Sequence, residues 1–261
     1  MIGWIALVAA LAAGFCGWSS LHQGRRLRLL RAARSSSVAE LLDLHATVVD
    51  GIGGGSFREL VKLEGELVCE EPLQAPWSGE ACVAFVDTVT HLYQERVEEQ
   101  TTDSEGRTTT KSRWEQRSQE VSRLERRCSF RLAQAGQELP VEPEQAELEW
   151  ESVLSILEPD DEAAPSGKGQ ALAPQQIRSL GMRRDEEVFR SGGRIFVVAE
   201  VSDASGSLAL RKPEQEGLFL IRREGEQVLL SRTSRQRRMW AVGSAVLVVT
   251  ALVLVVLSLA G

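Results

Sequence analysis

The sequence predicts a β-dominated α+β domain held between two transmembrane helices. The first observation is the charge distribution: all 30 basic and all 37 acidic residues lie between two uncharged ends, residues 1–23 and 240–261. The second is that the middle of the chain repeats short runs of β-branched, aromatic and aliphatic residues separated by Pro, Gly and Ser, a pattern typical of strands joined by turns. An ordinary soluble globular protein does not distribute its charge in this way, so we expect a membrane protein.

The two ends are long enough to cross a bilayer. As helices, residues 1–22 and 240–260 would each reach about 30 Å, the thickness of a hydrocarbon core. The second end is rich in Val and Leu, and nothing more polar than Ser or Thr interrupts it. A secretory signal is the alternative for the first end, but a signal carries its positive charges before the apolar stretch, and here they follow it. We therefore expect an uncleaved anchor at the first end.

Arginine clusters adjoin both expected spans. One lies in a basic juxtamembrane linker, residues 23–36, and the other in a basic collar, residues 232–239. Because positive charge favours the cytoplasmic side of a membrane, both clusters predict a two-pass protein with a cytoplasmic middle domain. The excess of Arg over Lys is typical of a GC-rich genome, which favours a bacterial inner membrane. The arginines expected to orient the spans or to contact lipid headgroups are Arg25, Arg26, Arg28, Arg31, Arg34, Arg235, Arg237 and Arg238.

Charge also narrows the class of partner. The two arginine clusters contribute +5 and +4, so a formal charge of −16 remains on residues 35–231. A nucleic-acid-binding protein needs a basic surface, and this acidic body argues against one. The partners that we expect are membrane lipids, an unidentified cytosolic or membrane protein, and a second copy of the chain.

The middle domain, residues 37–231, begins with a helix and continues with strands. Ser37 and Glu40 have the spacing of a capping box, and a leucine-rich helix follows them until Gly51 breaks the chain. Strands are expected at residues 60–69, 82–93, 108–121, 128–132, 139–141, 146–156 and 194–201. Opposite charges on the arms at 82–93 and 108–121 indicate a long, solvated hairpin with its tip at 103–106.

Three further segments complete the prediction. Residues 158–170 are predicted to form an acidic loop. Their carboxylates lack the spacing of a calcium-binding EF-hand, so no calcium site is expected there. Residues 175–180 read as a short helix. Residues 218–222 and 227–231 read as a hairpin that runs directly into the second span.

Two sequence motifs, and the order of the elements that follow them, are similar to those of a known protein family. Val61-Lys-Leu-Glu-Gly65 is followed by Pro72-Leu-x-Ala-Pro-x-Ser-Gly-x-x-Cys82, and later by a hairpin containing Trp114 and by the strand at 192–201. The order resembles the GIDE domain, also called the beside-a-membrane (BAM) domain, of mitochondrial-anchored ubiquitin and SUMO ligases, over roughly residues 35–260. The resemblance implies a structural or partner-binding role for Gly65, Pro72, Leu73, Pro76, Ser78, Gly79 and Cys82.

In the eukaryotic members of that family a zinc-binding RING follows the second span and supplies the ligase activity. A RING needs eight Cys or His ligands, and this sequence has four Cys and three His. The resemblance therefore implies a membrane-tethered scaffold or sensor that binds another protein without intrinsic catalysis. The alternative is a component of a ubiquitin-like conjugation system, an E3 ubiquitin ligase-like protein whose RING is supplied in trans.

No catalytic or metal site is predicted from the remaining polar residues, and no cofactor is implied. Ser78, Asp87 and His91 have the residue types of a nucleophilic triad, but no nucleophile-elbow motif is present, and Asp87 and His91 fall on one expected strand. Ser78 is expected to cap backbone groups in a turn. Cys69 and Cys82 are expected to be buried, reduced thiols, with a redox pair or metal ligation as the alternatives.

Overall fold

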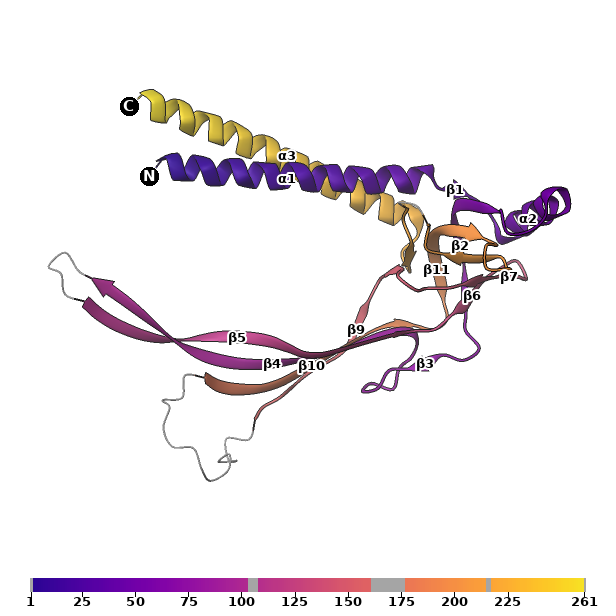
Figure 1. The fold of residues 1–261 in the computed structure, drawn as a ribbon, viewed down its shortest axis with the longest axis horizontal. Coiled ribbons are helices and arrows are strands. Elements are labelled where there is room, and N and C mark those ends of the chain that lie inside the picture. Colours follow the sequence, from indigo (N-terminus) through magenta and orange to yellow (C-terminus); the bar gives the residue numbers. More distant parts are fainter. Residues whose placement is uncertain (1, 103–107, 161–176, 215–216, 261) are drawn as a thin grey trace. The chain divides into compact units, whose positions relative to one another are not determined.

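The computed structural model describes residues 2–102, 108–160, 177–214 and 217–260 (Figure 1). The chain forms two compact units, and each is interrupted by the other in sequence. Unit 1 comprises Met1–Cys69, Ser129–Glu149 and Gly192–Gly261, and unit 2 comprises Glu70–Cys128 and Trp150–Ser191. The predicted β-dominated domain is thus confirmed as β-rich, but residues 37–231 are divided between two units.

Unit 1 is built on an eight-stranded sheet. In spatial order its strands are β1 (Arg34–Ser35), β2 (Arg58–Val68), β6 (Phe130–Gln134), β7 (Gln137–Val141), β12 (Ala209–Arg211), β11 (Arg194–Ser202), β13 (Leu220–Arg222) and β8 (Glu147–Leu148). β2 also pairs with β11, from Arg58 opposite Ser202 to Glu66 opposite Arg194. The β-branched and aliphatic side chains predicted for these two strands supply much of the buried core, including Val61, Leu63 and Val197.

The helix predicted after Ser37 is confirmed as α2 (Val38–Ile52). The Ser37 side chain accepts a hydrogen bond from the Glu40 backbone N–H at 3.2 Å, as a helix cap does. The helix continues past Gly51 and is capped by Gly53, whose φ of +89° suits a residue without a side chain.

Two long helices extend from the sheet of unit 1. They are α1 (Ile2–Ala32) and α3 (Glu226–Ala260). Phe15 and Trp240 meet edge to face with their centroids 6.2 Å apart, so the two helices lie side by side. Within the described part of the chain, no helix is both long and apolar enough to cross a membrane.

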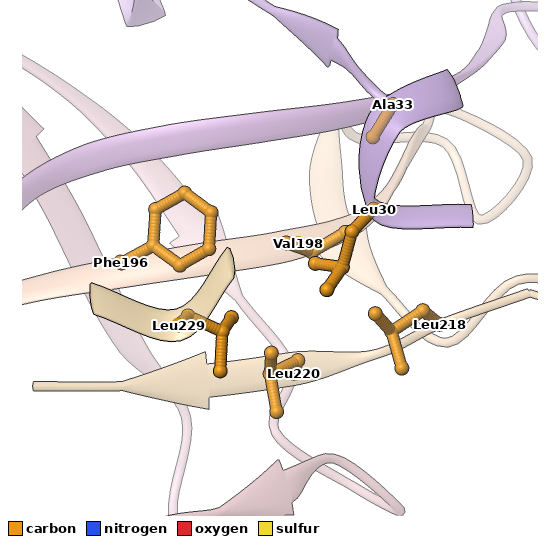
Figure 2. Close-up of a cluster of buried hydrophobic side chains, with 7 residues drawn as sticks. All are labelled: Leu30, Ala33, Phe196, Val198, Leu218, Leu220 and Leu229. Carbon is orange, nitrogen blue, oxygen red and sulfur yellow. The ribbon is translucent and has the colours of Figure 1, made fainter. Parts of the chain in front are cut away.

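One buried cluster fixes the C-terminal end of α1 and the N-terminal end of α3 to the sheet (Figure 2). Leu30 and Ala33 come from the α1 end of the chain and Leu229 comes from α3. They pack against side chains of β11 and the β13 segment, which are Phe196, Val198, Leu218 and Leu220. The direction of each helix at the sheet is therefore set by apolar packing.

This packing explains two wrong predictions. The segment 23–36 is not a linker over most of its length: α1 runs through it to Ala32, because its apolar residues recur at helical spacing and bury Leu27 and Leu30. Likewise, residues 227–231 form the first turns of α3 rather than a strand, and Leu229 needs that helical path to reach the cluster.

Unit 2 is a five-stranded sheet around the predicted hairpin. Its strands are β3 (Leu73–Gln74), β4 (Ala81–Thr102), β5 (Thr108–Arg127), β9 (Glu151–Glu158) and β10 (Ile177–Arg190). The long β4–β5 pair is confirmed, and Arg117 lies 3.5 Å from Glu95 on the opposite arm. The tip, residues 103–107, and most of the predicted loop at 158–170 lie outside the described residues.

Two other predictions for this region are wrong. Residues 146–156 are not one strand: β8 joins the sheet of unit 1 and β9 joins that of unit 2, with Trp150 between them. From Ile177 onward the predicted helix at 175–180 is strand β10, because the segment pairs with β4 on one side and β9 on the other.

A buried carboxylate fastens the glycine-rich connector to unit 1. Asp203, which is 4% exposed, accepts hydrogen bonds from the backbone N–H groups of Gly55 (2.8 Å) and Phe57 (2.9 Å). Nε2 of His45, on α2, lies 3.1 Å from the same carboxylate. The Gly55 N–H is the main reason that the pKa of Asp203 falls below its ordinary 3.8, with Phe57 and His45 acting in the same direction against burial.

This contact gives unit 1 a defined acid sensitivity. Because the pKa is lower in the folded than in the unfolded chain, the stabilisation is complete above the unfolded pKa and is lost as the pH falls through the folded pKa. We expect Asp203→Asn to lower the thermal midpoint of the purified full-length chain at pH 7, with the gap to wild type narrowing below about pH 4. Thermal unfolding followed by near-UV circular dichroism at each pH measures the midpoint. Asp43→Asn, on the exposed side of α2, is the control, and equal losses in both variants would contradict the assignment.

Candidate functional site

The proline-rich motif forms a tight, ordered turn between β3 and β4 of unit 2. Leu73 and Gln74 pair with Cys82 and Ala81, and the chain reverses between them. Ala75 N–H donates to the Glu80 carbonyl and Gly79 N–H donates to the Ala75 carbonyl, each at 3.0 Å. Gly79 has a φ of +71°, a conformation that residues with side chains rarely adopt. The glycine of the motif is therefore a requirement of the turn.

A buried carboxylate from β10 holds this turn. Glu186 is fully buried, and its two oxygens accept hydrogen bonds from Trp77 N–H at 2.9 Å and Ser78 N–H at 2.8 Å. Charge-assisted bonds of this kind are among the strongest in proteins. The Ser78 hydroxyl accepts from Glu80 N–H at 3.3 Å, as predicted for a capping serine. One carboxylate thus fixes two consecutive backbone groups at the top of the turn.

The turn presents an indole to solvent. Trp77 is 49% exposed, although aromatic side chains of this size are usually more buried. The Arg184 guanidinium carbon lies 4.1 Å from the ring centroid, a cation–π contact, and Arg184 is held in turn by Glu158 at 3.2 Å. Trp and Arg are the residues most enriched among those that dominate protein–protein binding energy. The arrangement is a rigid, half-exposed aromatic anchor.

Beneath the turn lies a small apolar cluster. Its buried members are Ala75, Cys82, Phe85 and Val188, with Leu73 packed against them. The Cys82 thiol is buried and donates to the Leu73 carbonyl at 3.7 Å. Fully buried Cys82 and partly buried Leu73 therefore pack beneath the turn and support it.

Six of the seven motif residues lie together in unit 2, and Gly65 does not. It lies in β2 of unit 1, where a side chain would come within 2.6 Å of the Ala133 carbonyl oxygen. The pattern did not reveal Glu186 and Arg184, since neither has a local sequence signal and both lie more than a hundred residues beyond the turn. Trp77 occupies an unspecified position of the motif, and only its size marks it in the sequence.

The predicted arginines fall into two groups. Arg26 forms an ion pair with Glu147 at 2.5 Å, and Arg34 pairs with Glu40 and Glu59, so these two are tied to the folded domain. Exposed arginines on the long helices form the other group, which comprises Arg25, Arg28, Arg31, Arg235 and Arg238. The side chain of Arg237 lies outside the described residues.

The residue types of a triad are not assembled into one. Nε2 of His91 lies 2.6 Å from the Ser179 hydroxyl, and its ring stacks on Tyr93, whereas Ser78 is engaged by Glu80. Among the described residues, no three His, Cys, Asp or Glu side chains gather in a way that could hold a metal ion. The geometry of the turn suits binding, with Trp77 as the contact.

Comparison of the sequence with known proteins identifies one protein family. A family model for GIDE, described as an E3 ubiquitin ligase, matches residues 98–257. No curated protein and no solved structure matches the chain. The matched range begins after the proline turn but includes Glu186 and Arg184, which hold that turn in place. Because the matched range covers more than half of the sequence, the chain belongs to the GIDE family.

Proposed function

We propose that this protein is a membrane-anchored GIDE protein that binds a partner protein through the Trp77 turn and acts as a scaffold or sensor. The observation that carries the proposal is the half-exposed Trp77. The Arg184 guanidinium lies over its ring, and its backbone N–H donates to buried Glu186. Ordering these groups in advance lowers the entropic cost of association, since a partner meets an anchor that is already in place.

Anchoring is supported by a coincidence between sequence and structure. The uncharged run of α1 ends just before Arg25, and the uncharged run of α3 begins at Trp240. Phe15 lies 6.3 Å from Trp18 and 6.2 Å from Trp240, centroid to centroid, so a tryptophan from each helix lies near one level along the pair. Tryptophan is enriched at the membrane–water interface. We propose that this level is the interface of a bacterial inner membrane, with the β-rich units in the cytoplasm.

Site-specific crosslinking tests the partner-binding role. A photo-crosslinking amino acid at position 77 of the full-length, membrane-held chain is expected to give a discrete adduct with one protein. The same amino acid at position 114 is the matched control, because Trp114 is 47% exposed and also lies in unit 2, on β5. Identical adducts from both positions, or none from position 77, would overturn the proposal.

A second candidate is a component of a ubiquitin-like conjugation system, with the RING supplied by another protein. The observation that favours it is the description of the matching family model as an E3 ubiquitin ligase. The two candidates differ in the identity of the adduct at position 77. A conjugating enzyme or a RING protein would favour the second candidate, and a protein without such a domain would favour the scaffold or sensor.

A further inference from the structure

A groove runs along one face of α1 in unit 1, at the level where the uncharged sequence ends. It has a volume of about 650 Å³. Its lining residues recur every three or four positions and therefore share one side of the helix. They are Trp18, Leu21, His22, Arg25, Arg28, Leu29 and Ala32.

The groove has a cationic stretch that follows an apolar one along α1. At one end Trp18 is 65% exposed and Leu21 is 74% exposed. His22 stacks on Trp18 with the centroids 6.0 Å apart. Further along the helix stand two guanidinium groups, those of Arg25 and Arg28, three residues apart, and Leu29 and Ala32 lie beyond them. Among the described residues that line the groove none carries a carboxylate, so the cationic stretch attracts an anion.

The opposite side of the helix is committed to the folded domain. Leu27 and Leu30 are buried there, and Arg26 is paired with Glu147. Leu29 packs against the cluster that holds α1 to the sheet, whereas Arg25 and Arg28 are exposed in the groove. Substitutions at Arg25 and Arg28 can remove its charge without removing a buried side chain.

We propose that this groove binds one anionic phospholipid, with its phosphate between Arg25 and Arg28 and an acyl chain along Leu21 and Trp18. Guanidinium groups recognise phosphate through paired hydrogen bonds, and an exposed Trp–Leu surface suits a hydrocarbon chain. An inorganic anion would use only the cationic half. The inference rests on the proposed anchoring, which places the groove at the bilayer surface, where anionic headgroups are concentrated.

Lipid retention by the full-length chain tests the site. The purified protein in neutral detergent is mixed with phosphatidylglycerol or phosphatidylcholine, and native mass spectrometry measures the lipid-bound fraction. Wild type is expected to retain one phosphatidylglycerol in preference to phosphatidylcholine.

R25Q/R28Q is expected to weaken phosphatidylglycerol retention about tenfold, as is typical when contacts with a bound charge are lost. R123Q/R126Q is the matched control, since it removes two exposed arginines, also three residues apart, from β5, and it is expected to stay within about twofold of wild type.

Several outcomes would overturn the site. They are equal retention of both lipids by wild type, equal loss in the two double variants, and displacement of the lipid by millimolar inorganic phosphate. Alkaline extraction of membranes tests the anchoring separately. Release of wild type into the supernatant would contradict the anchoring, whereas wild type that stays in the membrane but lacks lipid selectivity would contradict the groove alone.

Discussion

Glu186→Ala is expected to release the proline turn and to lower the free energy of unfolding of unit 2 by about 3–5 kcal/mol. The substitution removes the acceptor of two charge-assisted hydrogen bonds and leaves the N–H groups of Trp77 and Ser78 without their partner in the fold. It also leaves a void beside the apolar cluster that contains Val188. Hydrogen exchange of the full-length chain, followed by mass spectrometry, should show lost protection in the peptide spanning residues 72–80.

Two further variants separate the bonds from general damage to β10. Glu187→Ala changes the adjacent, half-buried carboxylate, whose side chain points to the other face of the sheet, and should leave residues 72–80 protected. Glu186→Gln keeps the volume but turns one acceptor into a donor that faces an N–H group, so it should lose most of the protection. Full protection in the glutamine variant would show that shape, and not hydrogen bonding, holds the turn.

Gly65→Ala is expected to destabilise unit 1 by about 1–3 kcal/mol, the usual cost of forcing extra atoms into a packed interior. The added carbon would lie 2.6 Å from the Ala133 carbonyl oxygen and 3.0 Å from a Leu132 methyl group, and a backbone atom cannot move aside without disturbing the β2–β6 pairing. Denaturant unfolding, with near-UV circular dichroism as the readout, measures the change.

Gly51→Ala is the matched control for this substitution. No atom lies within 4 Å of the carbon that it would add, and the residue lies in the last turn of α2. Since Ala is a better helix former than Gly, this variant should be neutral or more stable by up to about 1 kcal/mol. Equal destabilisation by both substitutions would contradict the close approach between β2 and β6, since the effect of Gly→Ala on the unfolded chain alone is stabilising.

The sequence predicted those elements whose cause is local. The cap at Ser37 and the strands around Val61, Val86 and Val197 follow from side-chain types within a few residues, and all are confirmed. β10 could not be predicted in this way. Its charged residues do not resemble a strand, and they are accommodated because Asp185 bonds Ser155 at 2.6 Å on the neighbouring strand β9. Tertiary pairing overrides local propensity there.

The residues of the candidate site likewise fall into those that the sequence predicted and those that only the fold brings together. The motif predicted the residues that shape the turn, since Pro and Gly restrict the backbone wherever they occur. The groups that fix Trp77 in the turn, Glu186 and Arg184, come from β10 and are joined to it only by folding. No pattern within the motif specifies that a glutamate more than a hundred residues later will accept its backbone N–H groups. The arginines were predicted as one class, and only the structure separates Arg26, which is paired inside the domain, from Arg28, which lines a groove.

The interleaving of the two units has a consequence for biosynthesis. The β4–β5 hairpin pairs neighbouring segments and can form as soon as both leave the ribosome, but β2 must wait for β11, which is made more than a hundred residues later. During that interval the apolar face of β2 lacks its partner strand, while α1 has already been synthesised. The eight-stranded sheet therefore closes only near the end of translation.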